Sequence, residues 1–205
     1  MKQGRRKRLA MGLVLCCLIV WLLPVQSLAL NHAVERGDTM WKLAVRYQVG
    51  TREIILANPQ IKNPDLIYPG QLLTIPTLEN KITSYESEVV RLVNEIRKEQ
   101  GLTQLSVNWE LSRVARYKSQ DMHDLGYFSH TSPTYGSPFE MMKAFGITYR
   151  SAGENIAYGY RTPQAVVEAW MNSPGHRANI LNRSFTQIGV GYVADGNYCT
   201  QMFLG

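Results

Sequence analysis

Three side chains suited to acid–base chemistry stand out because each lies in a short motif that contains turn-forming residues. Glu154 belongs to Gly153-Glu154-Asn155-Ile156-Ala157, His176 to Ser173-Pro174-Gly175-His176, and His130 to Phe128-Ser129-His130. A carboxylate and an imidazole can share protons or hold a ligand once the fold brings them together. The chain has no His-Glu-x-x-His helix that would place such groups on one face. The sequence therefore predicts a site that only the tertiary structure can assemble.

The elements that must position these side chains change type along the chain. A first helix is expected to open with a capping box at Thr83-Ser84-Tyr85-Glu86 and to end at Gly101. Further helices are expected from Asn108 to Gly126, from Ser137-Pro138 onward, and from Thr162-Pro163 to about Met171. The pattern then alternates, which predicts a closing β-hairpin, 187–193 and 197–204, around Asp195-Gly196. Helices followed by a late hairpin indicate an α+β domain.

Residues 84–205 resemble the bacterial branch of the CAP superfamily, the cysteine-rich secretory, antigen 5 and pathogenesis-related proteins. Besides the three motifs above, the matching positions are Asn94, Arg97, Leu105, Trp109 and Phe185-Thr186-Gln187-Ile188-Gly189-Val190-Gly191. The resemblance implies a three-layer α-β-α sandwich in which helices cover a small central sheet.

The same resemblance implies a cleft with two histidines and two acidic residues, a set often proposed to hold a divalent metal. His130, Glu154 and His176 match three of these positions. The fourth acid should follow the tryptophan by three residues, but Ser173 stands there. Glu168 precedes Trp170 by two residues, on another part of the helix, and is only a loose candidate.

Two chemistries are open to this incomplete set. Two neutral imidazoles and a carboxylate suit zinc or a similar divalent ion and leave a position for water, which the metal would acidify. The alternative without metal is acid–base work in which Glu154 orients a histidine. The sequence makes no cofactor certain. The candidate is a divalent metal such as zinc, for which His130, Glu154 and His176 would be the ligands.

A purely structural interpretation of these residues is also open. Glu154 would then bond a buried loop amide, and His176 a backbone carbonyl, as buried polar groups normally do. Ser173 lies three residues before His176, but no oxyanion hole is evident, so a serine-hydrolase interpretation has little support. Several tyrosines of this region are expected either to line the cleft or to pack in the core or at the rim: Tyr127, Tyr135, Tyr149, Tyr158 and Tyr160.

Residues 32–76 read as strand, helix, helix, strand and resemble a LysM module. The matching motifs are Gly37-Asp38-Thr39, Ala57-Asn58-Pro59 and Ile67-Tyr68-Pro69-Gly70-Gln71. Asp38 or Thr39 is expected to cap the first helix. The family binds N-acetylglucosamine polymers, peptidoglycan or chitin, in a shallow groove. In this chain the resemblance implies a groove lined by Gly37, Asp38, Thr39, Met40, Asn58, Pro59, Gln60 and Ile61. The alternative is a structural role only, in which Gly37 allows the turn and Asp38 caps the helix.

The first 29 residues are expected to be a secretory signal peptide cleaved after Ala29. They combine a basic start, an apolar run from Leu9 to Leu23 and a Ser27-Leu28-Ala29 cleavage motif. Five of the 22 basic residues lie there, and without them the net charge falls from +6 to +1. We therefore expect no nucleic-acid partner and, after cleavage, no membrane anchor; the alternative is that the segment stays uncleaved as a membrane anchor. Cys199 is the cysteine left in the mature chain and is expected to be a buried core thiol.

These observations predict an exported, cell-wall-associated bacterial protein. The expected order along the chain is a signal peptide (1–29), a LysM module (32–76), a linker (77–83) and a CAP domain (84–205). One hypothesis is an adaptor or structural protein of the wall or spore envelope, with a CAP cleft that binds a small ligand, a metal or a protein partner. The other is a metal-assisted hydrolase of wall polymer or peptide. The missing fourth acid favours the first hypothesis, while His130, Glu154 and His176 keep the second open.

Overall fold

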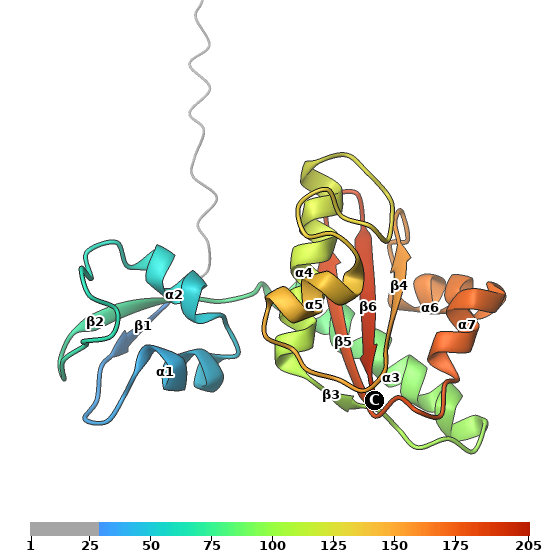
Figure 1. Cartoon of the computed structure of the whole chain (residues 1–205), viewed down its shortest axis with the longest axis horizontal. Helices are drawn as coiled ribbons and strands as arrows, with labels where there is room; N and C mark the ends of the chain where they lie inside the picture. The colour runs from blue at the N-terminus through green and yellow to red at the C-terminus, as the bar shows by residue number, and fades with distance from the viewer. Residues whose placement is uncertain (1–28) are drawn as a thin grey trace, which may run out of the picture.

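The structure is a computed structural model that describes residues 29–205, apart from the side chains at positions 80 and 81. Figure 1 shows a small N-terminal module joined by a short connection to a larger domain. Within residues 29–205, no helix is both long and apolar enough to cross a bilayer. Residues 1–28, which hold nearly all of the expected signal peptide, lie outside the described residues.

The N-terminal module has the expected βααβ order. Strands β1 (Ala29–Ala33) and β2 (Leu72–Pro76) pair antiparallel, and helices α1 (Met40–Tyr47) and α2 (Thr51–Ala57) lie between them in the chain. The module's apolar core includes Leu43, Ile54, Leu73 and Ile75. Thr39 caps α1, since its hydroxyl accepts from the Lys42 amide at 3.1 Å. Of the two expected caps, Thr39 is therefore the correct one.

The connection between the two parts is shorter than the predicted linker. Helix α3 (Asn80–Glu99) begins inside residues 77–83, and Glu79 is its N-cap without a side-chain capping bond. The predicted capping box at Thr83 is therefore wrong, because Thr83 already lies within the first turn. Across the connection, Glu53 of α2 accepts hydrogen bonds from Arg113 at 2.6 Å and from the Tyr117 hydroxyl at 2.8 Å.

A four-stranded sheet forms the middle layer of the larger domain. Its strands are β3 (Ser106–Val107), β4 (Ala152–Ala157), β5 (Gln187–Val193) and β6 (Tyr198–Leu204), in the order β3-β5-β6-β4. β3 pairs parallel with β5, and the other pairings are antiparallel. The β5–β6 hairpin confirms the sequence prediction. β4 was not expected as a strand, and it forms the sheet edge at which Glu154 lies.

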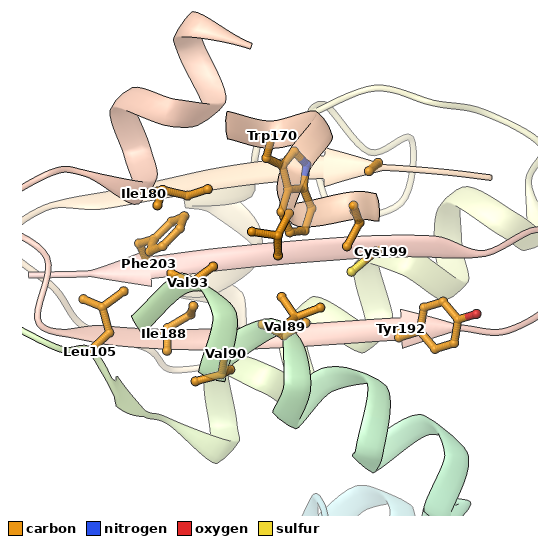
Figure 2. Close-up of a cluster of buried hydrophobic side chains, with 14 of the residues drawn as sticks. Val89, Val90, Val93, Leu105, Trp170, Ile180, Ile188, Tyr192, Cys199 and Phe203 are labelled. Atoms are coloured by element: carbon orange, nitrogen blue, oxygen red, sulfur yellow. The ribbon is translucent and has the colours of Figure 1, made fainter. Parts of the chain in front are cut away.

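Helices cover both faces of this sheet. One layer contains α3, α6 (Pro163–Asn172) and α7 (Pro174–Ile180), and the other contains α4 (Trp109–Asp124) and α5 (Pro138–Ala144). Figure 2 shows the first interface, where Val89 and Val93 of α3 face Ile188, Cys199 and Phe203 beside Trp170. The α-β-α sandwich is therefore confirmed, as are the expected helix starts at Asn108, Ser137 and Thr162, which are the N-caps of α4, α5 and α6. Cys199 is fully buried in this core, as expected.

Helix α4 packs unusually close to the sheet because β5 carries glycines where it faces that helix. A Cβ added at Gly191 would lie 2.0 Å from the Arg116 backbone nitrogen, and one at Gly189 would lie 2.4 Å from the Leu111 carbonyl carbon. Residues 189 and 191 point toward α4, while Ile188 and Val190 point into the opposite core. This close approach fixes the helix that supports the site below.

Candidate functional site

Glu154 is a buried carboxylate in the middle of edge strand β4. Its side chain is 2% exposed, and its Oε1 lies 2.7 Å from Nδ1 of His130. Within the described residues its other oxygen, Oε2, has no hydrogen-bond partner. Burial raises the pKa of Glu154, although the His130 hydrogen bond and the positive charge of Lys118 act in the opposite direction. Burial thus favours the neutral form of this carboxyl, and the carboxyl lies within hydrogen-bond distance of the His130 imidazole.

The loop that carries His130 is tied to α4 through Asp121. The Asp121 carboxylate accepts hydrogen bonds from the hydroxyls of Tyr127, Ser132 and Thr134, the Ser132 bond being 2.6 Å. Burial alone would raise the pKa of Asp121, but these three donors together lower it. The ionised Asp121 therefore clamps both ends of the loop, which leaves the His130 side chain 53% exposed at the surface.

Lys118 is a buried cation beneath this pair. Its residue is 1% exposed, and its ammonium donates to the His130 carbonyl at 2.8 Å and to the Tyr127 hydroxyl at 3.3 Å. Burial lowers the pKa of Lys118, while Glu154 and Asp121 oppose that shift. Lys118 thus supplies a positive charge between two acids and holds the backbone of the His130 loop.

His176 reaches the same edge of the sheet from the other layer. It lies on α7, and its carbonyl accepts from Asn155 Nδ2 at 3.1 Å. Asn179 of the same helix donates to the Glu154 carbonyl at 3.1 Å. Burial lowers the pKa of His176, and the charge of His130 adds to this effect. The imidazole is therefore held in its neutral form, close enough to His130 to respond to its charge.

Arg97 of α3 fixes the far end of α7. Its guanidinium donates to four backbone carbonyls, those of Thr103, Ile180, Asn182 and Phe185, at 2.8–3.3 Å. The residue is 1% exposed, so these bonds are shielded from water. Arg97 therefore positions α7, and with it His176, through contacts that do not touch the site.

A cavity of about 410 Å³ opens beside His176. Its lining combines aromatic and small apolar side chains with Ser173 and His176: Phe128, Ile156, Ala157, Tyr158, Tyr160, Ala169, Trp170, Ser173 and His176. Two further cavities, of about 290 and 320 Å³, lie where the N-terminal module meets α4, and none of the predicted cleft residues lines them.

The structure brings together part of the predicted cleft. His130 and Glu154 are in contact, and His176 and Ser173 line the neighbouring cavity. Glu168 is exposed on α6 and does not line that cavity. Within the described part of the chain, no group of three or more His, Cys, Asp or Glu side chains is placed to hold a metal ion. The metal set His130, Glu154 and His176 thus stays a prediction.

In the N-terminal module, several predicted groove residues serve its core. Met40 is buried, and Asn58 is fully buried with its side chain bonded to Ile54, Gln60 and Thr74. The Asp38 carboxylate accepts from the Glu35 amide and lies 2.8 Å from His32. The predicted groove residues that the structure leaves exposed are Gly37, Thr39, Pro59 and Gln60, with Asp38 and Ile61 half-buried. The side chains of Met40 and Asn58 can therefore support a groove but not contact a ligand freely.

Sequence reasoning missed Lys118 and Asp121. A signal for Lys118 was present, because it follows Leu111, Val114 and Ala115 at helical spacing on the inward face of α4. A lysine on such a face has to find buried partners. Asp121 gave no comparable signal, because its hydroxyl partners are arranged by a loop without periodicity.

Comparison with known proteins identifies both halves of the chain. A model of the cysteine-rich secretory protein family, CAP, matches residues 90–203, and a LysM domain model matches residues 32–76. Both matches confirm the resemblances and their order along the chain.

Similar proteins include an uncharacterised Bacillus subtilis protein, YkwD, which is 58% identical over 132 residues, or 64% of this chain and 51% of YkwD. A solved extracellular protein with an SCP domain from Bacillus anthracis superposes with a TM-score of 0.58 at 34% identity, over 66% of this chain and 47% of that one. The spore coat assembly protein ExsA of Bacillus cereus is 44% identical over 46 residues, 22% of this chain and 7% of ExsA. This chain therefore spans about half of YkwD and a small part of ExsA.

Proposed function

From the domains of this chain we propose that it is an exported, cell-wall-associated protein. The chain belongs to the cysteine-rich secretory protein (CAP) family and carries a LysM domain ahead of its CAP domain. Its LysM module binds peptidoglycan or a related N-acetylglucosamine polymer, and its CAP domain is displayed on the wall. It acts as an adaptor or structural protein whose CAP cleft binds a ligand. The observation that carries this proposal is the tandem of the two domains.

The LysM residues available for this binding are the exposed backbone and side chains of its two loops. Gly37 and Thr39 lie on one loop, and Pro59 and Gln60 on the other. Gly37 has φ +91°, a conformation that favours glycine and so fixes the turn before α1. Backbone amides and carbonyls on such turns can pair with the acetamide groups of the glycan.

A spore-envelope setting is one version of this function. The LysM region is similar to part of a protein named for spore coat assembly, and that similarity covers 22% of this chain. In this version the module anchors the chain to the glycan layer of the spore, and the CAP domain meets a protein partner there.

The second candidate function is a hydrolase of wall polymer or peptide. The Glu154–His130 pair favours it, because a buried acid bonded to an exposed imidazole is an arrangement suited to proton transfer. A divalent metal held by His130, Glu154 and His176 would supply Lewis-acid activation of water if it bound. The protein's own part would be to orient His130 through Glu154 and to keep His176 neutral.

One experiment separates these functions. The mature chain, residues 30–205, is incubated with purified peptidoglycan sacculi, and both the pelleted protein and the soluble fragments are measured. The adaptor function predicts pelleting without fragments, in the wild type and in His130→Ala and His176→Ala alike. Fragments released by the wild type and lost in both variants would establish the hydrolase instead. Metal analysis of the purified chain accompanies the assay, since absence of any bindable divalent ion would exclude the metal-assisted version.

A further inference from the structure

Exposed aromatic rings line part of the CAP cavity. Phe128, Tyr158 and Tyr160 all line it, and they are 47%, 55% and 38% exposed. Large apolar rings left together in water at a cavity mark a binding surface more often than chance. We call these three rings the aromatic rim.

The aromatic rim is held in place before any ligand arrives. The Phe128 and Tyr158 rings are 4.8 Å apart, and the Tyr158 ring is 5.8 Å from that of Tyr198. Between the two rim tyrosines, the Gly159 amide donates to the Gly196 and Asn197 carbonyls in the β5–β6 turn. Gly159 has φ +84°, so this tight connection depends on glycine. Rings fixed in this way lose little entropy when they bind.

The polar groups of the cavity suit an uncharged ligand. No Lys, Arg, Asp or Glu side chain is among its lining residues. In the described part of the chain, no hydrogen-bond partner is found for the Ser173 hydroxyl or for the ring nitrogens of His176. A hydroxyl and an imidazole can each take part in hydrogen bonds with uncharged polar groups. They would pair with the hydroxyl or acetamide groups of a ligand that lies against the rim.

We propose that this cavity and the aromatic rim bind a short stretch of neutral glycan. The apolar face of a sugar ring would lie on Phe128 and Tyr158, and its hydroxyl or acetamide groups would meet Ser173 and His176. A cavity of about 410 Å³ lies within the range of small-ligand sites. A lipid chain fits less well, because it would leave the hydroxyl and imidazole of the cavity unpaired. The inference rests on the proposed function, in which the LysM module brings the domain to the wall glycan.

The indole NMR signals of the tryptophans report ligand binding in the two domains separately. Once the leader and Trp21 are removed, the mature chain keeps Trp41, Trp109 and Trp170. Trp41 is exposed on α1 of the LysM module, whereas Trp170 lines the CAP cavity and donates its indole N–H to the Ile156 carbonyl at 3.3 Å. Trp109 lines a cavity at the contact with the module and serves as an internal reference.

The test is a titration of ¹⁵N-tryptophan-labelled chain with a tetramer of N-acetylglucosamine, followed by the three indole signals. We expect a saturable shift of the Trp170 signal and little change at Trp109. Tyr158→Ala should weaken the affinity reported by Trp170 about tenfold, the loss expected for about 1.4 kcal/mol of ring contact, and Tyr158→Phe should restore most of it. Phe128→Ala should weaken it similarly. Phe139→Ala is the matched control, because Phe139 is 49% exposed in the same domain but outside the cavity.

The possible results separate this inference from the proposed function. If sacculi pellet the chain but the tetramer leaves Trp170 unmoved, the LysM function stands and the glycan cavity is refuted. If dodecanoate, a medium-chain fatty acid, shifts Trp170 and the tetramer does not, the cavity is a lipid site and the inference is overturned. If Tyr158→Ala and Phe139→Ala weaken the Trp170 response equally, the rim does not carry the binding.

Discussion

Replacement of Arg97 by methionine tests how the fold positions His176. Arg97 spans from α3 to the end of α7, where it donates to four backbone carbonyls while 1% exposed. No acid partners it, so its charge is balanced by carbonyl dipoles alone among the described residues. Methionine fills similar space but donates nothing, which leaves the carbonyls of Ile180 and Phe185 without this donor.

The magnitude follows from the number and burial of these bonds. A hydrogen bond to a charged group contributes about 1.5–3 kcal/mol, and part of this is offset by the desolvation of the guanidinium. Loss of the whole buried set should therefore lower the free energy of unfolding by about 3–5 kcal/mol. For a chain of this size that corresponds to a fall in Tm of roughly 10 °C.

Urea unfolding of the mature chain, followed by circular dichroism, measures this change. Arg91→Met is the matched control, because Arg91 lies on the same helix, is 51% exposed and pairs with Glu88 and Glu95 at the surface. Its loss should cost less than about 1 kcal/mol. An Arg97→Met variant that loses no more than the Arg91→Met control would refute the role given to Arg97.

Other predictions concern the packing of α4, the contact between the domains and the pH response. Gly191→Ala should lower the free energy of unfolding, measured in urea, by about 3 kcal/mol, because the added Cβ would lie 2.0 Å from the Arg116 backbone nitrogen. Gly175→Ala is the control and should change this free energy little, because the space around Gly175 is open. Glu53→Gln removes the ion pair with Arg113, so residues 77–79 should be cleaved faster in limited proteolysis while Tm hardly changes; equal cleavage would contradict this contact. The pKa of His176 is lowered in the folded chain, so below about pH 6.5 the unfolded chain binds more protons than the folded one, and wild-type stability falls as the pH drops through that range. His176→Gln removes this group and should therefore flatten the pH dependence of stability. Parallel stability curves for both proteins between pH 5 and 7.5 would argue against it.

The parts of the fold that sequence reasoning predicted are those governed by local bonds. Asn108, Ser137 and Thr162 each cap the helix that follows them through their own side chains, so short-range patterns were sufficient. The β5–β6 hairpin was likewise predicted from alternation around Asp195-Gly196.

The missed elements depend on tertiary contacts. β4 has the sequence Ala-Gly-Glu-Asn-Ile-Ala, which has little intrinsic strand preference, and it is a strand because it pairs with β6 over its whole length. Pro174-Gly175 was interpreted as a turn, yet Pro174 occupies the first turn of α7, a position that suits proline. His176 therefore lies on a helix, and its side chain reaches the cavity.

The candidate site was only partly predictable. The family resemblance placed His130 and Glu154 in one cleft, and the structure joins them. Nothing in the spacing of these residues indicated that Lys118 would hold the His130 loop. The tyrosines were expected either in the cleft or in the core, and the sequence did not distinguish Tyr158 and Tyr160, which line the cavity, from Tyr127, Tyr135 and Tyr149, which do not. Those contacts depend on how α4 and the loop after β4 meet the sheet edge, which no local pattern describes.

Sedimentation of the mature chain with purified sacculi, in the presence of rising concentrations of soluble N-acetylglucosamine tetramer, tests the central claim most directly. The account predicts that the chain pellets with the sacculi and that the tetramer releases it in a dose-dependent way. A chain that stays in the supernatant, or one whose pelleting the tetramer leaves unchanged, would contradict glycan recognition by this protein.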